Sequence, residues 1–196
     1  MRGVNFRTVP LHLAAVVAPL LLAACSTRTS FMRDADPLPA PGAGDAKVVV
    51  FRPSTFAGTT QFPIYEYLED DAKLLGFAES GCYFEVKCPA GRHFFLTWGE
   101  GEAFIDAELA PKKTYYVRCY ARFGVISPRP GFAPVSLGSE ERRNLDEELK
   151  DLKCRALDAT KAESYAEVKE ERALKAKQSY DEGRKAPRHL KPEDGR

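Results

Sequence analysis

Histidine is scarce in this 196-residue chain, which contains only His12, His93 and His189. Histidine is the usual side chain for proton transfer near neutral pH and a common metal ligand, so both kinds of chemistry have few candidates. An excess of one charge is also lacking, with 29 Lys and Arg residues against 28 Asp and Glu. A nucleic-acid binder must neutralise many phosphates. We therefore expect no nucleic-acid partner.

Short catalytic motifs are missing as well. The chain has no phosphate loop, dinucleotide fingerprint, zinc-protease motif or serine-hydrolase elbow. Asp106 and Glu108 are interpreted as strand-surface acids rather than as an acid–base pair. Cys88 and His93 supply only two metal ligands, fewer than a zinc site needs. We expect no enzyme activity, no catalytic residue, no metal and no cofactor.

No apolar run reaches the roughly 20 residues that a membrane-spanning helix needs. The longest run, residues 11–22, is interrupted by His12 and Pro19 and is preceded by Arg2 and Arg7 without any acid. A spanning helix is the alternative interpretation, which this length disfavours. A basic start followed by a short apolar run is typical of an export signal. Residues 1–24 are therefore predicted to be a signal peptide.

The signal segment ends Leu22-Ala23-Ala24-Cys25, which resembles the lipobox of bacterial lipoproteins. The resemblance implies cleavage before Cys25 and attachment of lipid, with acyl chains such as palmitate, to that residue. Two or more acyl chains give a stable membrane anchor, whereas one does not. Ser26 follows in place of the aspartate that retains lipoproteins in the inner membrane. We expect a lipid anchor in the outer membrane of a Gram-negative cell, on its periplasmic face. An ordinary buried cysteine is the alternative.

Composition divides the remaining chain into four parts. Residues 25–46 are rich in Ser, Thr, Pro and Gly and are predicted to be the lipidated N-terminus and a flexible tether. Residues 47–137 contain short apolar and aromatic runs separated by turn residues, which indicates β-strands. Residues 138–183 are densely charged and are predicted to form a helical arm. Residues 184–196 are predicted to be a disordered tail.

The strand region alternates apolar and polar side chains, so each strand has one apolar face. Two such layers packed face to face are the simplest way to bury these faces. The predicted fold is mainly β, an Ig-like or PEGA-like antiparallel β-sandwich of about seven to eight strands, followed by the charged α-helical extension. The expected strands are residues 47–52, 63–68, 73–78, 82–88, 93–98, 103–109, 114–122 and 125–135, the last broken by prolines.

The helical arm has two different halves. Leu145, Leu149 and Leu152 form an apolar stripe, so the first half is expected to dock on the sandwich. In the second half only one of the two heptad positions stays apolar, which favours a solvated arm over a coiled coil. Gly183 is predicted to end the helix. We expect an envelope protein partner to bind through this arm.

Four cysteines besides Cys25 belong to a compartment in which disulfides persist: Cys82, Cys88, Cys119 and Cys154. Cys82 and Cys88 would lie about 20 Å apart in an unbroken strand, so their pairing is disfavoured. The two pairings that join them to Cys119 and Cys154 stay open, and one disulfide is expected. Helical phase leaves a free, exposed Cys154 as the alternative. A thiol oxidoreductase is disfavoured because no C-x-x-C pair is present.

Tyr116, Arg118, Tyr120 and Arg122 alternate along one predicted strand. Aromatic rings interleaved with guanidinium groups can stack on sugars, peptides or aromatic ligands. We interpret these residues as a candidate ligand or partner face. The alternative is a face that packs Arg stems on Tyr rings or receives the C-terminal helix.

Four segments behind the lipobox carry a resemblance: Val48-Val49-Val50-Phe51-Arg52-Pro53, Gly76-Phe77, Tyr83-Phe84-x-Val86-x-x-Pro89-x-Gly91-x-His93 and Tyr115-Tyr116-Val117-Arg118. They resemble a domain-of-unknown-function family of bacterial lipoproteins. The likeness covers residues 47–137 and implies a small β-sandwich without an assigned activity. The four cysteines and the charged helix depart from the family pattern. Cys25 of the lipobox is the one site residue that the resemblance supplies.

These observations predict a membrane-anchored bacterial lipoprotein that serves as a non-enzymatic structural or protein-interaction module of the cell envelope. The alternative is a periplasmic ligand-binding module for an envelope glycan or peptide, which would use the Tyr116/Arg118/Tyr120/Arg122 face. An envelope enzyme is a third class, for which the sequence offers no motif.

Overall fold

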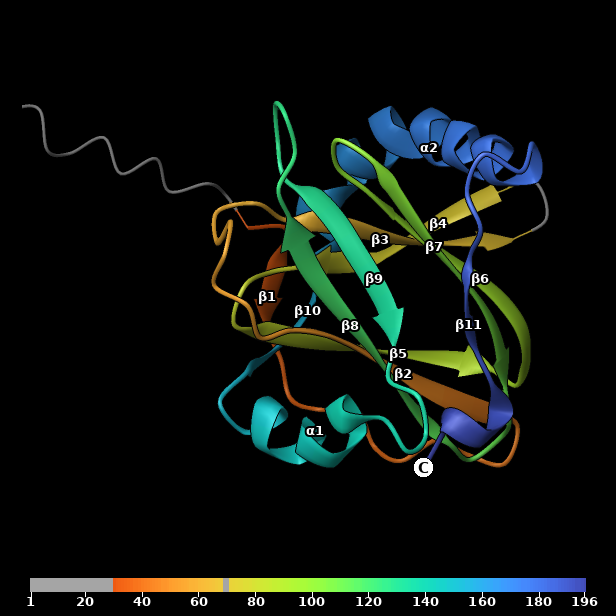
Figure 1. Cartoon of the computed structure of the whole chain (residues 1–196). Coiled ribbons are helices and arrows are strands. Elements are labelled where there is room, and N and C mark those ends of the chain that lie inside the picture. Colours follow the sequence, from red (N-terminus) through yellow and green to blue (C-terminus); the bar gives the residue numbers. More distant parts are fainter. Residues whose placement is uncertain (1–29, 69–70) are drawn as a thin grey trace, which may run out of the picture.

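The computed structural model describes residues 30–68 and 71–196, in which two β-sheets are stacked and each carries a helix on its outer face (Figure 1). The predicted signal peptide and Cys25 lie outside the described residues. The six-stranded sheet has the order β1 (Met32–Asp34), β10 (Lys153–Leu157), β5 (Cys82–Pro89), β2 (Asp45–Arg52), β8 (Thr114–Arg122), β9 (Arg129–Pro134). The five-stranded sheet has the order β11 (Arg188–Leu190), β7 (Glu102–Leu109), β6 (Gly91–Trp98), β3 (Phe62–Leu68), β4 (Asp71–Ala78). The helices are α1 (Glu140–Lys150), α2 (Ala159–Asp181) and the short 3-10 helix η1 (Pro192–Asp194).

The mainly β prediction is confirmed, but both sheets are mixed rather than antiparallel. Strand β2 runs parallel to β8, β5 parallel to β10, and β7 parallel to β11. Side-chain alternation identifies a strand and its buried face but carries no information about the direction of its neighbour. The strand count was also too low, because β1, β10 and β11 are too short to show a period-2 pattern.

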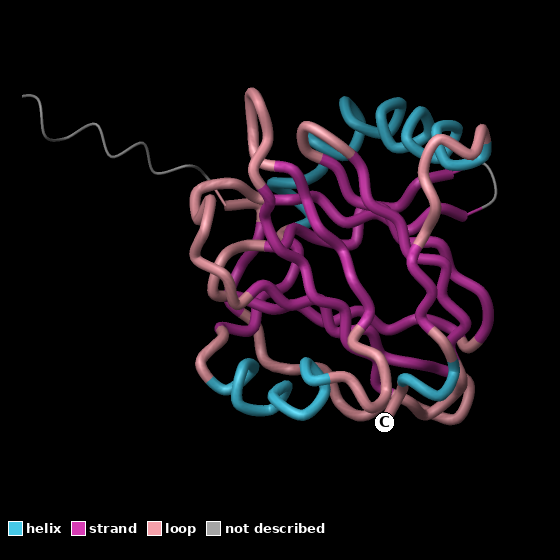
Figure 2. Tube along the Cα trace, in the orientation of Figure 1, coloured by secondary structure: helices cyan, strands magenta, loops and turns pink. Residues whose placement is uncertain are grey.

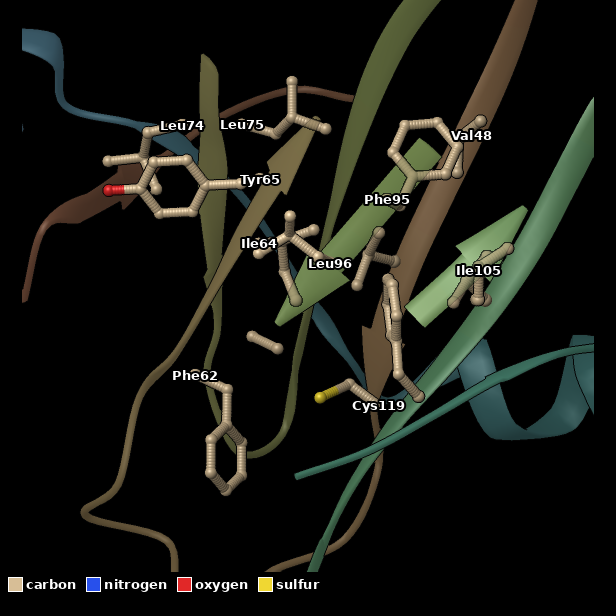
Figure 3. Close-up of a cluster of buried hydrophobic side chains, with 14 of the residues drawn as sticks. Val48, Phe62, Ile64, Tyr65, Leu74, Leu75, Phe95, Leu96, Ile105 and Cys119 are labelled. Atoms are coloured by element: carbon tan, nitrogen blue, oxygen red, sulfur yellow. The ribbon is translucent and has the colours of Figure 1, made fainter. Parts of the chain in front are cut away.

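The main core fills the space between the sheets. Figure 3 shows part of it, including Val48 and Cys119 of the six-stranded sheet and Phe95 and Ile105 of the five-stranded sheet, all of them buried. The sheets approach closely at Gly76 of β4. A Cβ placed there would lie 3.1 Å from the Phe84 ring of β5, so glycine leaves the room that this ring fills.

Helix α1 covers the outer face of the six-stranded sheet, as its leucine stripe predicted. Ser139 caps the helix by accepting the backbone N–H of Arg142. Leu145 is fully buried in a second cluster that includes Phe51 and Tyr116. Burying one leucine from water stabilises the fold by roughly 1.5–3 kcal/mol. This apolar contact fixes the helix against the sheet.

The predicted helical arm is wrong in two respects. Residues 138–183 form two helices, which lie on opposite sides of the molecule (Figure 2). They are separated in sequence by strand β10, which lies between β1 and β5 in the six-stranded sheet. Moreover, α2 is not solvated on all sides, because Ala162, Ala173 and Ala176 are buried against the five-stranded sheet. Alanines gave a weak apolar stripe in the sequence, yet their small size allows the helix backbone to approach the sheet closely. Gly183 has φ of +70° just past the helix, as predicted for its end.

The tether and the tail are also corrected over their described residues. Within the predicted tether, Met32 of β1 is buried and pairs with Leu157 of β10. Within the predicted disordered tail, β11 pairs with β7 and Leu190 is buried. Arg196 exchanges backbone hydrogen bonds with Thr114. Both segments therefore complete sheets, although their Pro, Gly and charged residues resembled linkers.

Candidate functional site

A loop between β8 and β9 exposes large apolar side chains to solvent. We call residues 123–128 the apolar loop; it extends beyond the sheets in Figure 1. Phe123 is 84% exposed, Val125 88% and Ile126 93%. Contiguous exposed apolar residues of this size mark an interaction surface more often than scattered ones do. The loop was not predicted from the sequence, where Val125 and Ile126 were placed in a final strand over 125–135.

The apolar loop is held in place by the carboxylate of Glu100. Its two oxygens accept backbone N–H groups of Val125 at 2.9 Å, Ile126 at 2.6 Å and Ser127 at 2.9 Å. Arg129 adds an ion pair to the same carboxylate at 2.6 Å. The three backbone hydrogen bonds lower the pKa of Glu100 to about 2, with a further contribution from Arg129. The apolar side chains are thus presented on a fixed backbone.

A neighbouring loop between β2 and β3 supports the apolar loop. The ring centroid of Phe56 lies 4.6 Å from that of Phe123. The backbone of this neighbouring loop is organised by Arg52, a fully buried side chain at the end of β2. Its guanidinium donates to the carbonyls of Phe56 at 2.8 Å and Ala57 at 2.9 Å, and also to those of Thr60 and Ala78. Burial lowers the pKa of Arg52.

The predicted Tyr/Arg face is divided in two by the structure. Tyr116 is 7% exposed, and its hydroxyl accepts a hydrogen bond from Arg196 at 3.0 Å. Arg118 forms an ion pair with Glu148 of α1. These two residues receive the helix and the C-terminus, as the alternative interpretation stated. They are not available to a ligand.

The other half of that face, Tyr120 and Arg122, lines a pocket of about 160 Å³ together with Lys185 and Arg188. Arg188 donates to the Tyr120 hydroxyl at 3.4 Å. Burial lowers the pKa of Lys185, and the charges of Arg122 and Arg129 lower it further. Three cations around one phenol ring attract anionic groups such as phosphates and carboxylates.

The four cysteines are free thiols in the described part of the chain, so the expected disulfide is absent there. Strand register explains why. Cys154 pairs with Tyr83, which places it on the outer face of the sheet, whereas Cys82 pairs with Arg52 on the inner face. Cys119 lies next to Arg52 on the far side of β2. Two strand spacings, about 10 Å, therefore separate Cys82 from Cys119, more than a disulfide spans.

Cys88 is likewise isolated from Cys119. Cys88 pairs with Ala46 at the start of β2, whereas Arg118, the neighbour of Cys119, pairs with Phe51 near the end of β2. Burial raises the pKa of all four thiols, and those of Cys88 and Cys119 reach about 12. These buried thiols are therefore protonated at neutral pH and are poor nucleophiles.

Glu66, Cys88 and His93 lie together between the sheets, with their ligand atoms within 4.8 Å of one another. His93 Nε2 donates to the Pro89 carbonyl at 2.8 Å, and Nδ1 is hydrogen-bonded to the Glu66 carboxyl group. Burial acts to lower the pKa of His93, but these hydrogen bonds and the Glu66 charge outweigh it, so the pKa is raised. Both ring nitrogens are thus engaged in hydrogen bonds within the protein, and the arrangement fits a buried structural pair. Glu66 was not predicted as a site residue, although an acid inside an apolar strand indicates a buried polar partner.

Comparisons with known proteins give no match: no family model, no curated protein and no solved structure resembles the chain. Within residues 30–68 and 71–196, no helix combines the length and the apolar character that crossing a membrane requires.

Proposed function

We propose that this protein is a membrane-anchored bacterial lipoprotein, acylated at Cys25, that serves as a non-enzymatic interaction module on the periplasmic face of the outer membrane. The likeness of residues 47–137 to an unassigned lipoprotein family with an Ig-like or PEGA-like sandwich is part of this proposal. Partner binding is assigned to the apolar loop instead of the helical arm, because α2 packs on the sheet through its alanines.

The apolar loop is the observation that carries this proposal. Its side chains would be buried in water-excluding contacts with a partner, and Glu100 fixes their backbone before binding. A binding loop on a rigid scaffold loses little conformational entropy when it meets its partner. The burial of Cys88 and the two hydrogen bonds of His93 support a structural role for the cluster of Glu66, Cys88 and His93.

The anchor is tested by intact mass spectrometry of the protein purified from native membranes. We expect a mass that begins at Cys25 and includes acyl chains. A Cys25→Ala variant should leave the membrane fraction, while a Cys154→Ala variant should remain there because Cys154 lies within the folded domain. An unmodified mass for the wild-type chain would contradict the proposal.

A second candidate function is binding of an acidic envelope glycan or peptide in the Tyr120/Arg122 pocket. The cluster of Arg122, Lys185 and Arg188 favours it. A ligand-induced rise in melting temperature that Arg122→Ala removes, and that Arg92→Ala on the other sheet preserves, would support this function. The absence of any shift across acidic glycans and peptides would contradict it.

A further inference from the structure

The apolar loop and the first described residue lie at the same end of the molecule. Ser30 donates a hydrogen bond to Glu79, and the adjacent Ser80 donates to the carbonyl of Ser54 at 2.9 Å. Two residues further on, Phe56 contacts Phe123 of the apolar loop. A continuous series of contacts therefore joins the start of the domain to the apolar loop.

The distance between the lipid on Cys25 and the start of the described domain is short. Met32 and Asp34 are paired in β1, so the described part of the chain is held in the six-stranded sheet from its first few residues. Five residue steps separate Cys25 from Ser30, and a fully extended chain spans at most about 18 Å over five residues. A lipid on Cys25 would consequently keep this end of the domain beside the membrane surface. The long tether expected from the sequence would not have imposed this.

Cationic side chains border the apolar loop. Arg122 and Arg129 flank it in the sequence, and Lys185 is close enough for both to lower its pKa. Arg129 is paired with Glu100, which leaves Arg122 and Lys185 as the cations beside the loop that are not paired with that carboxylate. Arg33 is exposed in β1, near the start of the domain. Apolar side chains bordered by Arg and Lys are typical of surfaces that enter the interface of an anionic bilayer.

We propose that the apolar loop is a second membrane contact, in which Phe123, Val125 and Ile126 enter the acyl region of the bilayer that holds the lipid anchor. This inference rests on the proposed lipid anchor, and it names a phospholipid surface as the partner of the loop. The anchor makes the second contact intramolecular, so a small apolar area suffices for it. The contact would fix the orientation of the domain on the membrane.

Tryptophan quenching by brominated lipids tests the inference in the full, lipidated protein. The chain has one tryptophan, Trp98, which is 5% exposed and gives a constant background. Ile126→Trp places a reporter in the apolar loop. The matched control is Leu137→Trp, because Leu137 is 62% exposed and follows the opposite end of β9. Both variants are reconstituted into vesicles of phosphatidylethanolamine and phosphatidylglycerol with brominated acyl chains.

We expect bromine to cause a loss of emission in Ile126→Trp beyond that of the wild type, and none in Leu137→Trp. If bromine causes no greater loss of emission in Ile126→Trp than in Leu137→Trp, while both variants float with the vesicles, the membrane contact is overturned and the lipid anchor is left intact. Shielding of Ile126→Trp only after an envelope protein is added would overturn it in favour of a protein partner. If the purified wild-type protein carries no lipid and does not float with the vesicles, both the lipid anchor and the membrane contact are overturned.

Discussion

Arg52 combines a full positive charge with complete burial, which is costly unless hydrogen bonds offset the loss of water. Its two terminal nitrogens donate to four backbone carbonyls, whereas its Nε has no hydrogen-bond partner within the described residues. The guanidinium carbon lies 4.9 Å from the centroid of the Phe62 ring. The side chain thus replaces the water that would otherwise solvate the loop after β2. The sequence carried a usable signal, because an arginine ends an apolar strand just before Pro53.

Replacing Arg52 with methionine should destabilise the protein strongly. The change leaves carbonyl groups without donors inside the fold, and we expect a loss of about 3 kcal/mol or more in unfolding free energy. Urea denaturation followed by Trp98 fluorescence measures it. Arg92→Met is the control, since the Arg92 side chain is 80% exposed, and it should change the value by less than about 0.5 kcal/mol. Similar losses in both variants would contradict the role of Arg52.

Glu100 should make the order of the apolar loop dependent on pH. Its folded-state pKa of about 2 lies below the usual 4.5, so its contribution is complete above the usual value and is lost as pH falls through about 2. The amide proton signals of Val125, Ile126 and Ser127 should shift together with that midpoint. Glu100→Gln should abolish the common transition. A midpoint near 4.5 in the wild type would show that the carboxylate does not hold the loop.

The cysteines should react with alkylating reagents in an order set by burial. Cys82 and Cys154 are partly exposed, whereas Cys88 is 2% and Cys119 0% exposed. In the folded protein at neutral pH we expect slow modification of the first two and none of the last two, followed by modification of all four after denaturation without a reducing agent. Mass spectrometry counts the modified thiols. A pair that reacts only after reduction would reveal a disulfide.

At the scale of elements, the sequence predicts the parts of the fold that repeat their signal over many residues. Strands β2 to β8 were located because each has an apolar or aromatic run bounded by turn residues. Strand β10, Lys-Cys-Arg-Ala-Leu, lies between two charged helical segments and gives no such run. Its position depends on the open edge of β5 and on β1, which are distant in sequence. Local patterns cannot encode such pairing.

The candidate site was less predictable than the strands. Tyr120 and Arg122 were identified from alternation alone, and the structure places both at a pocket. Tyr116 and Arg118 have the same alternation but are covered by α1 and the C-terminus. A strand pattern separates the two faces of a sheet, but it does not show which part of a face another element will cover.

Leu145 tests the docking of α1. Leu145→Ala removes a fully buried side chain from the second cluster, and we expect a loss of about 2–5 kcal/mol in unfolding free energy. Leu137→Ala, at a 62% exposed position just before the helix, should change it by less than about 0.5 kcal/mol. Thermal and urea denaturation both report the difference. An equally small effect at Leu145 would mean that the helix is not packed as described.

At the scale of the whole molecule, the two ends of the described chain each occupy a sheet edge, β1 on one sheet and β11 on the other. Arg196 also pairs with Asp146 of α1 and donates to Tyr116, and the ion pair lowers the pKa of Asp146. The C-terminus consequently joins α1 to β8. The predicted disordered tail would have had no such effect on stability.

Deleting residues 187–196 should therefore harm the fold. The deletion uncovers the edge of β7 and removes the contacts of Leu190, so we expect lower stability and a tendency to self-associate through the open strand. Size-exclusion chromatography and urea denaturation measure the two effects. Arg196→Gln, which keeps β11, should lose less stability and remain monodisperse. A truncated chain as stable as the wild type would show that β11 is dispensable.

The pairing of the chain ends also determines when the protein can fold. Met32 of β1 pairs with Leu157, and β7 pairs with residues 188–190, so each of these strands is synthesised long before its partner. Pairings between distant residues slow folding, because closing the long intervening loop costs entropy before the stabilising contacts can form. Both sheets therefore stay incomplete while the residues between the paired strands are being synthesised. That delay would suit a protein that must pass through a translocation channel before it folds.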